Sequence, residues 1–208
     1  AWGFGKGHRP TADTARIDSV MRYVGIGRTR MEHGCLVKDD ARVQFNFSAI
    51  AKGFGCDAVG EMLERNGVRD WLVEIGGEIA ARGNGPSGKG WRVSVDKPLL
   101  QRDTVAHESE CVVAFTDMGM ATSGNYRNFH TGKDGKSYGH TISARTGRPV
   151  LTDVLSATVL APTAMEADAL ATSLMSMQSA EGRSLTSKLN LPVMLILSDS
   201  TVWMSDKF

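Results

Sequence analysis

The chain has 208 residues, of which 41% are hydrophobic and 23% are charged, and its formal net charge is +1. These are ordinary values for a globular protein with a substantial core, and a near-zero charge without a basic run argues against a nucleic-acid partner. No apolar run approaches the roughly 18 residues that a membrane-spanning helix needs. The chain starts with Ala1 rather than Met, which indicates a trimmed or processed product.

The first part of the chain predicts a helix and a hairpin. Helical periodicity covers residues 11–23 and ends at Gly25. Residues 35–37 and 42–47 favour two paired strands, with Lys38-Asp-Asp40 in the turn between them. The expected core positions of the helix are Ile17, Val20, Met21 and Val24.

The stretch 46–57 is predicted to lead from a strand into a second helix, which runs to about residue 66 with Gly67 as its stop. Gly53 and Gly55 in its first turns are costly for a helix, so we expect a ligand or another backbone to come close there. Lys52 suits an anion at this end, helped by free N–H groups of the first turn. The alternative is a surface lysine whose stem lies along apolar surface.

Strands dominate the middle and the end of the chain. A tight Gly76-Gly77 turn joins two of them, and Lys133-Asp-Gly-Lys136 predicts a hairpin turn. A short helix is expected around 184–188. Because strands run in hairpins with helices interspersed, the fold class is α+β, with mixed or antiparallel sheets. The expected strands are 71–75, 78–82, 91–96, 111–115, 154–161, 193–197 and 201–204, and the residues expected in the core include Trp71, Trp91, Trp203, Cys35, Cys56 and Cys111.

The helix predicted over residues 163–177 carries the main chemical signal. Thr163 and Glu166 form a capping-box pattern, and the helix is apolar on both sides, which predicts burial. Asp168 and Thr172 share one face. A buried carboxylate must be paired, hydrogen-bonded or bound to a metal, so a hard divalent cation is one partner for Asp168. An arginine from elsewhere, or a neighbouring turn that Asp168 caps, is the alternative.

Six sequence blocks, in order over nearly the whole chain, resemble the ApbE family of FAD:protein FMN transferases. The resemblance implies a T-fold-related α+β architecture and a single catalytic domain over residues 1–208 that lacks the N-terminal portion of the family. The blocks are Trp2-Gly-Phe-Gly5, Ala49-Ile-Ala-Lys-Gly-Phe-Gly-Cys-Asp57, Val73-Glu-Ile-Gly-Gly77, Thr122-Ser-Gly-Asn-Tyr126, Tyr138-Gly-His140 through Thr146-Gly147, and Ala167-Asp-Ala-Leu-Ala-Thr172.

The resemblance also implies an activity and a set of site residues. The family is expected to move FMN from FAD onto a Thr or Ser hydroxyl of a target protein, to release AMP and to need Mg²⁺. The implied metal site combines the Asp168 carboxylate, the Thr172 hydroxyl and the Ala49 carbonyl, with Ala171 beside them. Positions that match FAD contacts are Asn46, usually Asp in the family, Lys52 and Ile142, and the histidine on which activity depends matches His140.

Residue chemistry is consistent with these roles. Oxygen ligands alone favour Mg²⁺, with Ca²⁺ as a possible substitute. Because histidine titrates near neutrality, His140 suits taking a proton from an attacking hydroxyl, although a structural hydrogen-bonding role is the alternative. The usual Asp-Pro of the family is here Ser143-Ala144, which we expect to loosen that loop. Thr122-Ser-Gly124 is expected to be a turn or a pocket wall.

Three functions remain open at this stage. The first is a Mg²⁺-dependent flavin transferase acting on a target redox protein. The second is a FAD pyrophosphatase that yields FMN and AMP, and the third is a flavin-binding module without turnover. By resemblance, we expect the intact protein on the periplasmic or extracytoplasmic face of the inner membrane, lipid-anchored, with a homodimer possible.

Overall fold

The computed structural model describes residues 14–98, 108–124, 129–131, 137–139 and 141–208. The chain divides into two compact units. Residues 1–46 and 129–151 form the first unit, and residues 47–128 and 152–208 form the second. Within the described residues, no helix combines the length and the apolar character of a membrane span.

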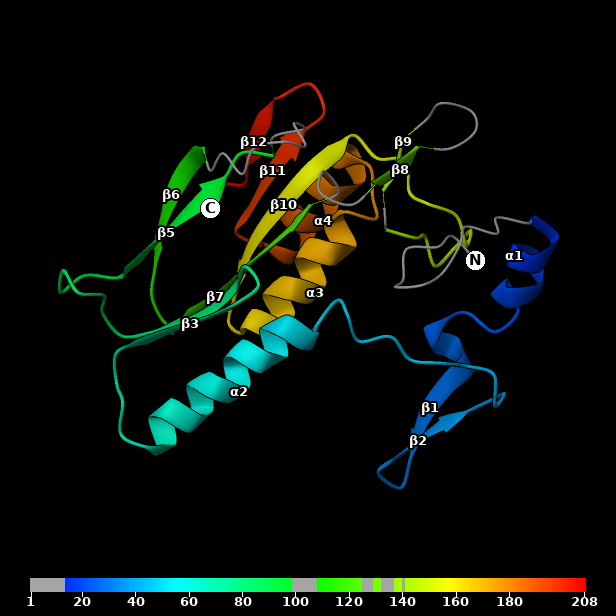
Figure 1. Cartoon of the computed structure of the whole chain (residues 1–208), viewed down its shortest axis with the longest axis horizontal. Helices are drawn as coiled ribbons and strands as arrows, with labels where there is room; N and C mark the ends of the chain where they lie inside the picture. The colour runs from blue at the N-terminus through cyan, green and yellow to red at the C-terminus, as the bar shows by residue number, and fades with distance from the viewer. Residues whose placement is uncertain (1–13, 99–107, 125–128, 132–136, 140) are drawn as a thin grey trace. The chain divides into compact units, whose positions relative to one another are not determined.

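The second unit is built on a six-stranded sheet in the order β12-β11-β10-β7-β4-β3, in which every neighbouring pair is antiparallel (Figure 1). The expected α+β class with antiparallel sheets is confirmed. The bounds of the strands are β3 Trp71–Ile75, β4 Glu78–Arg82, β7 Met118–Gly124, β10 Val154–Ala161, β11 Val193–Leu197 and β12 Val202–Met204.

Side chains alternate between the two faces of this sheet, as the pleat of a strand requires. On β10, Val159 and Ala161 pack with the helix α3 (Ala164–Leu174), while Leu160 packs into a second core on the opposite face. That second core includes Val95 and Phe115 from the hairpin β5 (Trp91–Asp96) and β6 (Ser109–Phe115). The sheet is therefore covered by helices on one face and by a hairpin on the other.

The helices α2 (Ala51–Arg65) and α3 lie side by side against the sheet (Figure 1). The predicted end of α2 before Gly67 is confirmed, and Gly67 has a positive φ of 81°. The helix expected around 184–188 is longer than predicted, because α4 spans Ser179–Leu189. Trp71 packs against α2 at Gly60, so its expected place in the core is confirmed.

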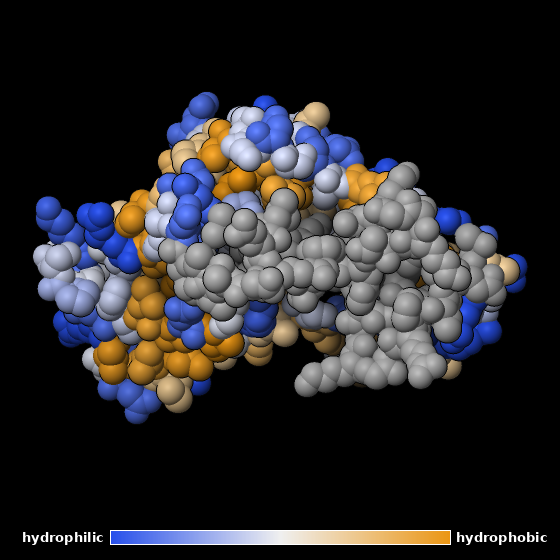
Figure 2. Space-filling view, turned by 45° about the horizontal axis from the view of Figure 1, so that its top comes forward, coloured by the Kyte–Doolittle hydropathy of each residue, from blue (hydrophilic) through white to orange (hydrophobic). Residues whose placement is uncertain are grey.

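Hydrophobic residues also remain at the surface, as the orange areas of Figure 2 show. On α2, the large exposed apolar side chains are Phe54, Val59 and Met62.

The first unit differs from the expected hairpin. Strand β2 (Cys35–Lys38) pairs with β1 (Thr29–Glu32), not with residues 42–47, in which no strand forms. The turn consists of His33 and Gly34, both with positive φ, as a two-residue hairpin turn of the primed type requires. Cys35 is exposed, so its predicted core role was wrong.

The remaining elements of the first unit are α1 (Thr14–Met21), a 3-10 turn over Ile26–Arg28, and the pair β8 (Phe129–Thr131) and β9 (Ser137–Gly139). In α1, Ile17 is buried as expected, but Val20 and Val24 are exposed, and the helix stops before Gly25. The predicted turn over 133–136 lies outside the described residues.

Candidate functional site

Asp168 is a buried acid at the contact between α3 and α2. Asp168 is 3% exposed, and its Oδ2 accepts a hydrogen bond from the Gly53 N–H at 3.2 Å. Burial raises the pKa of the Asp168 carboxyl, while the Gly53 N–H and the charge of Lys52 oppose that rise. Among the described side chains no ion pair involves Asp168, so the arginine partner considered from the sequence is not found there.

Two glycines allow the backbones to meet at this contact. A Cβ on Gly53 would lie 2.2 Å from the carbonyl oxygen of Ala164, and a Cβ on Gly119 of β7 would lie 2.2 Å from the Ala164 nitrogen. Both distances are far below van der Waals contact. The close approach predicted for Gly53 is therefore confirmed, and the partner is the first turn of α3 rather than a ligand.

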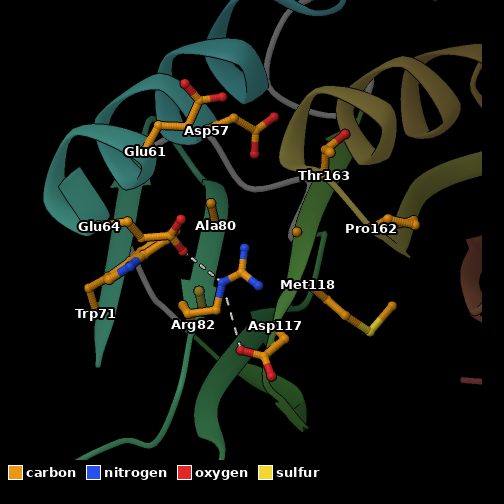
Figure 3. A pocket seen from close by; sticks show the side chains of 12 residues that line it. Asp57, Glu61, Glu64, Trp71, Ala80, Arg82, Asp117, Met118, Pro162 and Thr163 are labelled. Carbon is orange, nitrogen blue, oxygen red and sulfur yellow. Dashed lines mark ion pairs between the residues drawn. The ribbon is translucent and has the colours of Figure 1, made fainter. Parts of the chain in front are cut away.

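The two helices cap each other. Asp57 of α2 accepts hydrogen bonds from the N–H groups of Ala164 and Met165, both at 2.9 Å, and Figure 3 shows its carboxylate beside the start of α3. Thr163 adds its own cap through the Glu166 N–H at 3.1 Å, as predicted. Asp168 in turn binds an N–H in the first turn of α2. Since first-turn N–H groups have no partner within their own helix, each helix supplies what the other lacks.

The other residues predicted for the metal site lie on α3, which carries Asp168, and in the turn before α2. Thr172 lies one helical turn after Asp168, and its hydroxyl is 3.3 Å from that of Ser123 on β7. Ala171 is fully buried. Ala49 lies in the turn just before α2, and within the described residues no backbone N–H donates to its carbonyl. Thr122-Ser-Gly124 is the end of a central strand, so its interpretation as a turn was wrong.

Lys52 is paired with a buried acid that the sequence did not single out. Its Nζ lies 2.5 Å from Oε2 of Glu78, the first residue of β4. The N–H groups expected to assist Lys52 are largely taken, because Ala51 donates to the Phe47 carbonyl and Gly53 donates to Asp168. Any anion at this end of α2 would therefore meet the lysine ammonium more than the end of the helix.

Two predicted FAD contacts belong to the first unit. Asn46 is exposed, and Ile142 is half-buried and forms an isolated bridge with Pro149. His140, the predicted catalytic residue, lies outside the described residues. At the expected point of loosening, the Ser143 hydroxyl accepts hydrogen bonds from the N–H groups of Arg145 and Thr146.

A cavity of about 120 Å³ lies between α2, β4 and the start of α3, with Asp57 and Thr163 in its lining (Figure 3). Arg82 lies in its wall and pairs with Glu64 at 2.9 Å, with Asp117 at 3.9 Å. Of the described residues predicted to bind the metal or FAD, none lines this cavity, so the arrangement around Asp168 remains the candidate site.

The donors around Asp168 suit a hard divalent cation. In the described part of the chain, no three His, Cys, Asp or Glu side chains gather as a metal site. The set predicted from the sequence is instead one carboxylate, which is buried, one hydroxyl and one main-chain carbonyl, all oxygen donors of the kind that Mg²⁺ and Ca²⁺ prefer. A cation would also offset the cost of burying the Asp168 charge. The residues present therefore fit such an ion.

Three contributors to the site were missed at the level of sequence. Glu78 is the first residue of an apolar strand, and an acid at that position is equally compatible with exposure to solvent and with a buried ion pair. Asp57 lies in a helix whose partner is more than 100 residues away, so its capping role has no local signal. Ser123 was noted only as part of a turn or pocket wall.

Comparison with known proteins was made against this geometry. A family model described as the ApbE family matches residues 1–195. A FAD:protein FMN transferase from Haemophilus influenzae is 38% identical over 202 residues, covering 94% of this chain and 57% of the relative. One from Salmonella typhimurium is 32% identical over 216 residues, covering 100% of this chain and 60% of the relative.

A solved structure described as a flavin transferase ApbE from Vibrio cholerae shares the fold, with a TM-score of 0.85 and 35% identity. The match covers 100% of this chain and 66% of that one. The chain thus spans between 57% and 60% of the length of the two curated relatives above.

Proposed function

This chain belongs to the ApbE family, and from that premise we propose that it forms the core of a flavin transferase. The proposed reaction moves FMN from FAD to a Thr or Ser hydroxyl of a target redox protein. In this reaction the acceptor oxygen forms a bond to the FMN phosphorus, the bond from that phosphorus to the bridging oxygen breaks, and AMP leaves. The names of the similar proteins from Haemophilus influenzae and Salmonella typhimurium support the proposal.

The observation that carries the proposal is the buried Asp168 carboxylate, which faces the start of α2 where Lys52 lies. Phosphoryl transfer depends mainly on positioning and charge neutralisation. When bound, Mg²⁺ would neutralise charge on the pyrophosphate, held by Asp168, Thr172 and the carbonyl of Ala49. Lys52 supplies a second positive charge on the same end of α2.

Proton transfer is assigned to His140 on the strength of the family resemblance. As the hydroxyl attacks phosphorus, its proton passes to the imidazole, whose ordinary pKa is close to neutrality. Asn46 and Ile142 are proposed to contact FAD. We further propose that the intact protein works outside the cytoplasmic membrane, anchored by lipid, and that it can form a homodimer.

The test is incubation of the protein with FAD, MgCl₂ and an acceptor domain that the similar transferase from Vibrio cholerae modifies. That relative serves as the positive control. Flavin fluorescence that stays on the acceptor after denaturing electrophoresis, together with AMP in solution, is the expected result. Free FMN with AMP would instead indicate a FAD pyrophosphatase. Unchanged FAD beside a working control would contradict the proposal.

A further inference from the structure

Glu78 and Lys52 form an ion pair in which the Glu78 side chain is buried and the Lys52 side chain is partly exposed. The Glu78 side chain is 3% exposed, whereas that of Lys52 is 46% exposed, and the two charged atoms are 2.5 Å apart. An ammonium has three N–H donors. The ion pair places Nζ of Lys52 beside Oε2 of Glu78, and the open side of Lys52 leaves N–H donors available to a second anion.

The surroundings of the pair fix both partners. The thiol of Cys56 on α2 donates to the Glu78 carbonyl at 3.1 Å, which ties the start of β4 to the helix that carries Lys52. Gly76 has a φ of 63°, and a Cβ there would lie 3.3 Å from Cδ of Lys52. The Gly76-Gly77 turn therefore leaves room for the lysine stem and directs it toward Glu78.

The charges nearby keep Lys52 on Glu78. Burial raises the pKa of the Glu78 carboxyl, the neighbouring Asp168 charge raises it further, and Lys52 lowers it. If Lys52 moved away, two buried acids would remain close together without this cation, which is strongly unfavourable. Lys52 therefore stays paired with Glu78 while its exposed side meets another group.

We propose that Glu78 is a positioning residue: it holds the Lys52 ammonium at the start of α2, where Lys52 contacts the pyrophosphate of the dinucleotide substrate. This inference rests on the proposed function, since FAD supplies the pyrophosphate. Glu78 itself does not touch the substrate, and its effect on the substrate passes through Lys52.

The experiment is a double-mutant cycle of Glu78→Gln, Lys52→Met and the double variant, read by the dissociation constant of FAD from flavin fluorescence in the presence of MgCl₂. Glu78→Gln preserves shape and removes the charge that holds the ammonium. We expect about a tenfold weaker affinity for FAD, the order expected for one charge-assisted hydrogen bond. The double variant should bind FAD no more weakly than Lys52→Met alone. Glu74→Gln, the same change at an exposed site on β3, is the matched control and should leave the affinity unchanged.

Thermal unfolding of the same four proteins without FAD or metal tests the pair by itself. We expect Lys52→Met to lower the unfolding midpoint and the added Glu78→Gln to restore most of the loss. Unchanged FAD affinity in Glu78→Gln, or an equal loss in the presence and absence of Lys52, would overturn the positioning role. Failure of the wild-type protein to bind FAD would overturn the proposed function instead, and with it this inference.

Discussion

At the scale of single residues, Asp168 shows why the candidate site depends on charge rather than on hydrogen bonding. Its carboxylate is buried, and within the described part of the chain the Gly53 N–H is its one hydrogen-bond donor, although an ionised carboxylate can accept about four hydrogen bonds. The cost of burying that charge is therefore only partly offset by protein groups. A cation bound here would stabilise the folded state.

Asp168→Asn should separate the charge from the hydrogen bond, because the amide oxygen can still accept from Gly53. Without metal, we expect the variant to be within about 1 kcal/mol of the wild type in unfolding free energy. With Mg²⁺ at a hundred times its dissociation constant, the wild type should gain about 2.7 kcal/mol and the variant almost nothing. Urea unfolding with and without MgCl₂ measures both effects.

The matched control is Asp206→Asn, an exposed acid near the C-terminal end of the chain, which should respond to Mg²⁺ like the wild type. An equal Mg²⁺ response in Asp168→Asn would remove Asp168 from the proposed metal site.

The role of a residue could be predicted from the sequence where the pattern of its own helix or strand was sufficient. The burial of Asp168 and the cap at Thr163 follow from the pattern of their own helix, and both are confirmed. The roles of Glu78 and Asp57 depend on groups from other elements, Lys52 and the first turn of α3. No local pattern indicates such contacts, so only the structure could show them.

At the scale of elements, the crossing of α2 and α3 determines where the site residues lie. Gly53 and Gly119 remove the side chains that would hold Ala164 away. This packing brings Asp168 within hydrogen-bonding distance of α2.

Gly53→Ala should therefore destabilise the protein by ~1–3 kcal/mol, because the new methyl group would meet backbone atoms that cannot move independently. The comparison variant is Gly55→Ala on the same helix, where the nearest atom is Cδ1 of Ile75 at 3.1 Å, the end of a partly exposed side chain. There the helix propensity of alanine should make the change neutral or stabilising by up to ~1 kcal/mol. The free energies of unfolding of both variants, measured by chemical denaturation, test this prediction. Equal effects at the two positions would contradict the conclusion that the close approach at Gly53 determines how α2 and α3 pack.

Element bounds were predicted best where the pattern was strong. The strands 71–75, 78–82, 91–96, 154–161 and 193–197 were confirmed residue by residue, because alternating or continuous apolar residues end at Gly, Pro or polar turns. The hairpin in the first unit was missed because β1 consists of Thr, Arg, Met and Glu, three of them exposed, and so shows no burial pattern.

At the scale of the whole molecule, the second unit is held together by short polar links between distant segments. Near the start of β10, the Asp153 carboxylate accepts hydrogen bonds from the Ser179 N–H and hydroxyl at the start of α4, and the Asp153 carbonyl accepts from the Ser198 N–H. One residue thus joins the segment before β10, the first turn of α4 and the segment after β11. The sequence did not predict that residues 1–46 and 129–151 belong to one compact unit, because these two segments are far apart in the chain.

This link predicts a pH dependence. The hydrogen bonds from Ser179 lower the pKa of Asp153, so its contribution is fully present above the unfolded-state value of about 3.9 and is lost as the pH falls through the lower folded-state value. Asp153→Asn should cost about 1 kcal/mol at pH 7, as other losses at helix starts do, and the difference from the wild type should shrink in acid. Unfolding free energies from pH 7 down to pH 3 provide the measurement. A difference that stays constant or grows in acid would exclude this role for the carboxylate.

The exchange of carboxylates between α2 and α3 has a consequence for recognition. Because Asp57 closes the first turn of α3 while Asp168 closes that of α2, neither helix can shift without breaking the start of the other. A dinucleotide or an ion that binds there would meet Lys52 and the proposed oxygen ligands on helices that are already fixed. Its association would therefore lose little free energy to ordering this part of the protein. Slow amide exchange at Gly53, Ala164 and Met165 before any ligand is added would be the signature of such readiness.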